Sequence, residues 1–177
     1  MLVLHAVRLK GFADTEAIAA RFNLDPGQTA EDLLDAEAFG WVARAEFARL
    51  GGWSLTERGR RQNEDLLRAD LGDARAAVSA VHDRFVPLNA EASAAFTEWQ
   101  LGRATSTEPL ERLAEALRQI EADLARQRAR FTGYHSRFTK AQQNGGAWIT
   151  GVEVDSCHRV WFELHEDLIA TLGISRQ

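Results

Sequence analysis

The stretch GGWSLTERGRRQNEDLL, residues 51–67, combines three local signals that together decide the fold of the N-terminal part of the chain. Its pair of glycines is typical of a tight turn, because glycine adopts turn conformations without steric cost. The apolar segment from Trp53 to Leu55 has the character of a short strand. Thr56 is a favourable helix N-cap, and the charged run after it has helical propensity. The stretch therefore predicts the second strand of a hairpin that leads directly into a helix.

The residues before this stretch predict the other half of the hairpin and three helices. Residues 41–48 alternate between two faces with period two, and the turn is expected at residues 49–52. Apolar spacings of three and four residues indicate helices at about residues 2–10, 15–22 and 29–39. Three helices, a hairpin and a further helix follow the order of a winged helix-turn-helix domain. We expect this domain at residues 1–71.

The third predicted helix would be the recognition helix of such a domain. Thr29 and Asp32 have the spacing of a capping box, and Thr29 would begin the helix. An apolar inner face is expected from three residues, Leu33, Leu34 and Ala38.

Residues 72–177 predict a second, helical domain. A heptad-like seam of alternating three- and four-residue steps extends from Leu110 to Ala141. The helix predicted at residues 155–173 is apolar on two faces, whereas residues 147–154 predict an extended passage and Pro87 a kink or a restart of its helix. The predicted fold is therefore mostly α: a winged helix with a two-stranded wing, followed by a helical bundle. The seam and the last helix together favour a homodimer formed through residues 72–177.

Composition limits the classes of function. The chain has 177 residues, a net charge of −5 and one cysteine, Cys157, so that no internal disulfide can form. No apolar run is long enough to span a membrane, and we expect a cytoplasmic protein without membrane contact. Neither half of the chain is basic overall, so any DNA binding must depend on local patches of positive charge.

Parts of the sequence resemble known regulators. The segments HAVRLKGFADTEAIAARF (5–22) and WSLTERGR (53–60) resemble winged-helix transcriptional regulators of the MarR and PadR type. The segments LNAEASAAFTEWQ (88–100) and DSCHRVWFELHEDLIATLG (155–173) resemble an actinobacterial group labelled as such regulators. A similar helical module accompanies proteins related to pyruvate phosphate dikinase. The resemblance implies a DNA-binding transcriptional regulator, or alternatively a winged helix that has become a protein-interaction module or an adaptor for a dikinase-related enzyme.

Two departures from the family pattern bear on these alternatives. MarR-type regulators carry a dimerisation helix before the DNA-binding domain, whereas this chain starts on the first domain helix, as in the PadR type. The third helix is also acidic, because it carries Glu31, Asp32, Asp35 and Glu37 and no Lys or Arg. Such a helix in a DNA groove would repel phosphates.

The candidate DNA contacts are the arginines of the wing and the start of the third helix: Arg44, Arg49, Arg58, Arg60, Arg61, Gln28 and Thr29. The arginines could bind phosphates, and Arg49 is expected near the tip of the hairpin. The alternative is an ordinary charged surface, since several acids lie nearby in the sequence.

The candidate anion or effector site lies in the C-terminal half: Arg126, Arg130, Arg137, Tyr134 and Trp161. An effector could enter an aromatic interior formed by Phe96, Trp99, Phe131, Tyr134, Trp148 and Trp161. The alternatives are a solvated face beside the seam, or a basic surface that contacts the acidic third helix of a second subunit.

The sequence does not predict an enzyme, a metal site or a cofactor. His158 and His165 are seven residues apart on one helix, too far to share a metal ion. Cys157 and His158 are neighbours that point about 100° apart on a helix, which does not favour a nucleophile pair.

Overall fold

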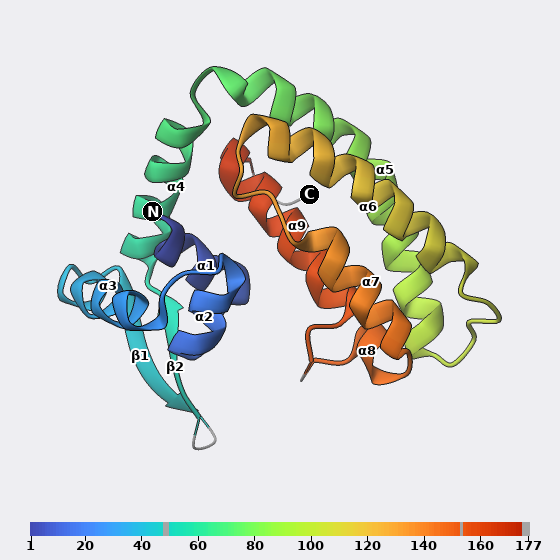
Figure 1. The fold of residues 1–177 in the computed structure, drawn as a ribbon, viewed down its shortest axis with the longest axis horizontal. Coiled ribbons are helices and arrows are strands. Elements are labelled where there is room, and N and C mark those ends of the chain that lie inside the picture. Colours follow the sequence, from blue (N-terminus) through green and yellow to red (C-terminus); the bar gives the residue numbers. More distant parts are fainter. Residues whose placement is uncertain (48–49, 153, 175–177) are drawn as a thin grey trace. The chain divides into compact units, whose positions relative to one another are not determined.

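The computed structural model describes residues 1–47, 50–152 and 154–174, and the chain is mostly helical (Figure 1). It divides into two compact units, of which the first comprises Met1–Gly72 with the described residues Gly173 and Ile174, and the second comprises Asp73–Leu172. Each unit is described by itself below.

Three helices form the first part of the N-terminal unit: α1 (Leu2–Lys10), α2 (Thr15–Arg21) and α3 (Pro26–Ala38). Asp14 caps α2 by accepting a hydrogen bond from the backbone N–H of Ala17 at 2.8 Å. Asp25 caps α3 in the same way, with the N–H of Gln28 as the donor at 2.8 Å. The predicted start of the third helix at Thr29 is therefore wrong, because Asp25 followed by proline at the first helical position already begins a helix there.

The buried face of α3 also differs from the prediction. Thr29, Leu33 and Ala36 are buried, whereas the side chain of Leu34 is 55% exposed and Ala38 is exposed. The earlier helix start explains part of the difference, since Thr29 now lies one turn before Leu33 on the inner face. Leu33 and Ala36 join the core of the unit with Ile18, Val42 and Trp53.

The hairpin consists of β1 (Val42–Phe47) and β2 (Leu50–Leu55), paired antiparallel with Phe47 opposite Leu50. The paired glycines 51 and 52 therefore lie inside β2, not in the turn as predicted. Gly52 has a packing role there, because a Cβ atom at this position would lie 2.5 Å from the ring of Phe12. The expected turn residue Arg49 lies outside the described residues.

A close backbone contact fixes the exit from the hairpin into α4 (Glu57–Leu71). The hydroxyl of Thr56 accepts a hydrogen bond from the N–H of Gly59 at 3.0 Å and donates one to the carbonyl of Gly40 at 2.7 Å. The carbonyl oxygen of Trp41 accepts from the N–H of Thr56 at 3.0 Å. The same oxygen would lie 1.7 Å from a Cβ atom at position 59, so this position requires glycine.

The regular elements in the described residues of the second unit are all helices. A short 3-10 turn (Gly72–Ala74) leads into α5 (Arg75–Gln100), and the remaining elements are α6 (Glu108–Gln127), α7 (Tyr134–Asn144), α8 (Ala147–Thr150) and α9 (Cys157–Leu172). The helix α8 occupies the first half of the passage, residues 147–154, that the sequence predicts to be extended. Pro87 lies inside α5 and neither ends nor restarts it. Buried side chains on both sides of the proline, Phe85 and Ala92, hold the two halves of the helix in the core.

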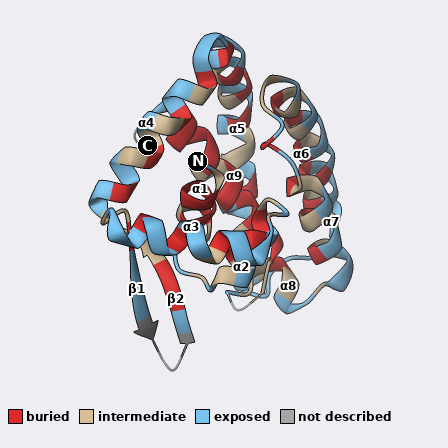
Figure 2. Ribbon diagram, turned by 60° about the vertical axis from the view of Figure 1, so that its left-hand side comes forward, coloured by how far each residue is buried: buried red, intermediate tan, exposed pale blue. Residues whose placement is uncertain are grey.

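The heptad-like seam is shared by two helices of the same unit. Its members Leu110, Leu113, Leu117, Ile120, Leu124, Phe131, Tyr134, Phe138 and Ala141 are all buried (Figure 2). The chain breaks between α6 and α7, where Gly133 adopts the left-handed conformation with φ of 84°. Helix α9 is buried along most of its length as well, although Phe162 on its second face is 46% exposed. The seam that suggested a homodimer is therefore the internal core of one chain.

The contact between Trp41 and Gly59 leads to a stability prediction. Replacing Gly59 by alanine should lower the free energy of unfolding by at least about 3 kcal/mol, because the backbone of two elements must move to admit the methyl group. Gly51→Ala is the matched control, since nothing lies within 4 Å of a Cβ atom there. Urea denaturation of both variants measures the difference. Equal midpoints for the two variants would contradict this account of the contact.

Candidate functional sites

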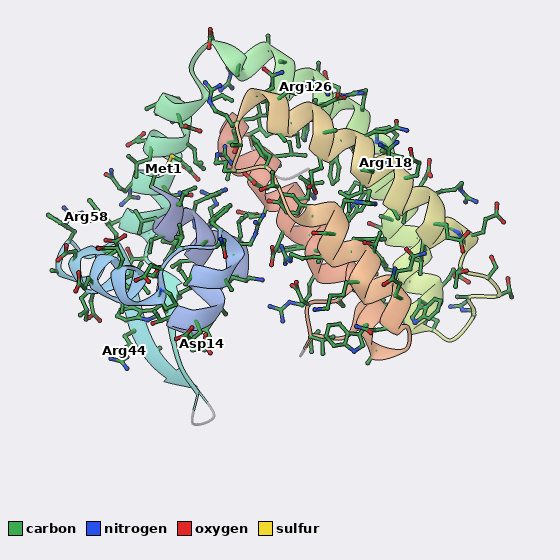
Figure 3. The ribbon with its side chains drawn as sticks, viewed as in Figure 1. Met1, Asp14, Arg44, Arg58, Arg118 and Arg126 are labelled. Carbon is green, nitrogen blue, oxygen red and sulfur yellow. The ribbon has the colours of Figure 1, made fainter. Side chains whose placement is uncertain are left out.

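Two of the predicted DNA contacts, Arg44 and Arg58, are exposed side chains of the N-terminal unit, and both are labelled in Figure 3. Arg44 lies on β1 opposite Trp53, with its guanidinium carbon 5.6 Å from the centre of the indole ring. Arg58 lies at the start of α4. Its Nη1 atom is 3.9 Å from the point where a Cβ atom at position 40 would lie, just beyond the C-terminal end of α3. Neither arginine forms an ion pair within the part of the chain that the structure describes.

The other predicted DNA contacts in the described residues already have interaction partners or are buried. Arg61 is exposed but pairs with Glu57 at 3.1 Å, and the amide of Gln28 donates to Asp32 at 3.0 Å. Arg60 is exposed on α4 and also has an interaction partner. Thr29 is only 1% exposed, so its inclusion among the DNA contacts is wrong: the earlier start of α3 places it on the buried face.

The exposed surface of α3 is the most distinctive part of this unit. Its carboxylates, Glu31, Asp32, Asp35 and Glu37, are all exposed. None of them pairs with a cation among the described residues. Exposed acids on other helices do pair with arginine, as in Glu57–Arg61, Asp65–Arg68, Glu108–Arg112 and Glu115–Arg118. The negative charge of α3 is therefore uncompensated.

Large apolar side chains accompany this charge. Leu34 is 55% and Phe39 is 54% exposed, and the ring of Phe39 stacks on that of Trp41 with 4.7 Å between the centroids. Exposed apolar groups within a charged rim are characteristic of protein-binding surfaces. We call the set Glu31, Asp32, Leu34, Asp35, Glu37 and Phe39 the α3 face.

In the second unit, two predicted effector residues belong to a buried hydrogen-bond network. Arg130 donates to Asp167 at 2.6 Å and to the hydroxyl of Thr171 at 2.7 Å. The hydroxyl of Tyr134 donates to the other oxygen of Asp167 at 2.7 Å. All four side chains are buried, and Arg130 also lies 4.1 Å from the ring centroid of Phe131.

Arg137 is held by two further carboxylates. It forms a bidentate pair with Asp155, with both contacts at 2.6 Å, and a third contact with Glu163 at 2.7 Å. Burial lowers the pKa of the Arg137 guanidinium, but the hydrogen bonds and charges of Asp155 and Glu163 outweigh burial and hold the pKa above its ordinary value. Arg137 therefore stays charged at every physiological pH.

These contacts correct the predicted effector site. The positive charges of Arg130 and Arg137 are already compensated by Asp155, Glu163 and Asp167, so they do not form a site for an external anion. The remaining arginine, Arg126, is exposed and pairs with Asp123.

The aromatic interior is packed as well. The indole N–H of Trp161 donates to Asn89 at 3.0 Å, and its ring stacks on Phe85 at 5.2 Å. Phe131 and Tyr134 are buried among the same helices, whereas Trp99 and Trp148 are half-buried.

The sequence analysis gave no role to the acids of α9 that pair with Arg130 and Arg137. Glu163 and Asp167 are four residues apart on a helix that is otherwise strongly apolar. Carboxylates on such a helix are a signal for buried cationic partners, since an unpaired buried charge is costly.

Burial shifts the pKa of two neighbouring titratable groups of the second unit, Cys157 and His158. Burial raises the pKa of the Cys157 thiol to about 12, and its sulfur lies 3.5 Å from the carbonyl oxygen of Phe138. Burial lowers the pKa of His158, whose ring packs 4.9 Å from Phe96. Among the described residues, no group of three or more His, Cys, Asp or Glu side chains could hold a metal ion.

Comparisons of the chain with protein-family models, with curated proteins and with solved structures each return no match. Within residues 1–47, 50–152 and 154–174, no helix is both long and apolar enough to cross a membrane. The functional argument therefore depends on the geometry above.

The buried network leads to a second stability prediction. Arg130→Ala should lower the free energy of unfolding by about 3–5 kcal/mol, because it leaves the Asp167 carboxylate buried without its cation. Arg126→Ala should have little effect, since exposed pairs contribute little. Replacing both partners, Arg130→Met with Asp167→Leu, should recover part of the loss. Equal effects of the two alanine substitutions in urea denaturation would contradict the assigned role of the network.

Proposed function

We propose that the N-terminal unit is a winged helix that acts as a protein-interaction module through its α3 face. The order of three helices, hairpin and helix supports the winged-helix assignment. Further support comes from an isolated bridge between Ala13 and Trp53, with N–H···O distances of 3.2 and 2.8 Å. This bridge pairs the segment between α1 and α2 with β2, as a short third strand does in winged-helix domains.

The uncompensated charge of the α3 face is the observation that carries the proposed function. In helix-turn-helix proteins that read DNA, the second helix of the motif lies in the major groove. A helix with four unpaired carboxylates in the groove would lie close to the DNA phosphates, which also carry negative charge. The repulsion between these like charges is unfavourable. The same helix is complementary to a protein surface that carries arginine or lysine.

The apolar members of the face define the partner further. Leu34 and Phe39 would gain by burial, at roughly 25 cal/mol for each Å² of apolar surface removed from water. We therefore expect a partner with apolar side chains surrounded by basic ones. The dikinase-related proteins to which the sequence resemblance points are the first candidates to test.

Site-specific photo-crosslinking tests this proposal. A photoreactive amino acid at position 34 should form an adduct with a defined protein in cells of the source organism. The adduct should be lost when Glu31→Gln, Asp35→Asn and Glu37→Gln are added, because the contact depends on their charge. Position 86 is the control, since Val86 is exposed on the other unit. The absence of any protein adduct specific to position 34 would end the proposal.

DNA is the second candidate ligand, and a specific observation favours it. Arg44 and Arg58 are exposed without a carboxylate partner in the described residues, and positively charged side chains of this kind bind phosphates. Together with the resemblance to MarR- and PadR-type regulators, this supports phosphate contact through the hairpin and the start of α4. In that case the α3 face would oppose binding.

An electrophoretic shift with duplex DNA at two salt concentrations distinguishes the two candidates. Under the protein-interaction proposal, the wild-type protein gives no shift at micromolar concentration. If DNA is the ligand, Arg44→Ala with Arg58→Ala should weaken binding on all sequences and reduce the salt dependence by about one unit of slope for each arginine. The triple α3 variant should then bind more tightly. If the wild-type protein binds DNA tightly and the variant without the two arginines does not, the protein is a DNA-binding regulator and the interaction-module proposal is wrong.

A further inference from the structure

A cavity of about 450 Å³ lies in the second unit, where α5 ends and α6 begins. Residues 103–106 of the loop that joins these two helices line it. Figure 1 shows the course of this loop between α5 and α6. This loop is tied to α5 by the backbone N–H of Arg103, which donates to the carbonyl of Glu98 at 2.8 Å. Cavities of this volume are typical of sites for small molecules.

The floor of the cavity is apolar. Leu110 and Leu113 of α6 are buried beneath it, and Ala95 and Trp99 of α5 line it from the other side. Trp99 is half-buried, and its indole N–H has no hydrogen-bond acceptor among the described residues. An apolar or aromatic group of a ligand can pack against this ring.

The cavity is lined by residues of both charges. Glu91 and Glu98 are exposed lining residues that lie two turns apart on the same face of α5. Arg103 of the loop and the hydroxyl of Ser106 supply hydrogen-bond donors. The described part of the chain gives neither the two carboxylates nor Arg103 an ion-pair partner. The second arginine of the rim, Arg112, pairs with Glu108 at 2.8 Å.

We propose that this cavity binds a zwitterionic small molecule of the amino-acid class with an apolar side chain. The ligand carboxylate pairs with Arg103 and accepts from Ser106, and its ammonium group pairs with Glu98. Its side chain packs on Trp99 and Leu113. A purely anionic ligand would place its negative charge beside two carboxylates that gain no cation. A purely cationic ligand would place its positive charge beside Arg103, which would gain no anion. The site is independent of the α3 face.

Calorimetric titration of the full chain with three amino acids, L-leucine, L-phenylalanine and L-tryptophan, tests the proposal. At least one of them should bind. For the L-phenylalanine framework, 3-phenylpropionate lacks the amine and phenethylamine lacks the carboxylate. Each should bind about tenfold more weakly than the parent amino acid, because each loses one charged hydrogen bond. No heat from any of the three amino acids at millimolar concentration, or equal binding of an analogue that lacks one charge, would overturn the proposal.

Variants locate the site. Arg103→Ala and Glu98→Gln should each weaken binding by about tenfold. Arg118→Ala, a change on α6 away from the cavity, should leave it unchanged. The indole N–H resonance of Trp99, assigned with Trp99→Phe, should shift on titration. Binding that survives both rim substitutions, or that leaves this resonance unmoved, would place the ligand elsewhere and refute the site.

Discussion

The close approach of the Trp41 carbonyl oxygen to Gly59 fixes how the elements of the N-terminal unit meet. Because the oxygen of Trp41 lies where a side chain at position 59 would begin, the end of α3, the hairpin and the start of α4 meet at a single point. Thr56 strengthens the junction by bonding to both sides of it. The positions of Arg44 on the hairpin and Arg58 on α4 relative to α3 follow from this junction, so the candidate interaction surfaces depend on it.

Charged side chains have different roles in the two units. In the second unit, the buried Arg130 and the half-buried Arg137 meet the buried carboxylates of Asp167 and Glu163, and the resulting pairs hold α7 and the segment before it to α9. This network gives the helices a defined arrangement, although replacing such pairs by apolar groups is often neutral for stability. In the first unit, the carboxylates of the α3 face are exposed, and no cation of the described residues pairs with them. The internal charges have a structural role, whereas the uncompensated external charges are available to a partner.

Most of the helices and the two-stranded hairpin could be predicted from the sequence, because short-range rules govern them. The cap at Thr56 and the end of the last helix near residue 173 depend on a few neighbouring residues. Local rules failed where two signals competed. Asp25 with its proline overrode the capping-box spacing of Thr29, and the glycines 51 and 52 served strand packing rather than a turn.

The sequence by itself determined the mostly helical fold, the hairpin and the acidity of the third helix, because each follows from residues close together in the chain. The tertiary structure decided which charged side chains pair with each other inside the protein. Arg130 meets Asp167, thirty-seven residues away, and Arg137 meets Asp155 and Glu163, so these two candidate arginines belong to internal ion pairs instead of an anion site. Likewise, the seam packs within one chain, and α3 is left without a cation. Pairings over such separations depend on how the helices pack, and local sequence patterns do not specify them.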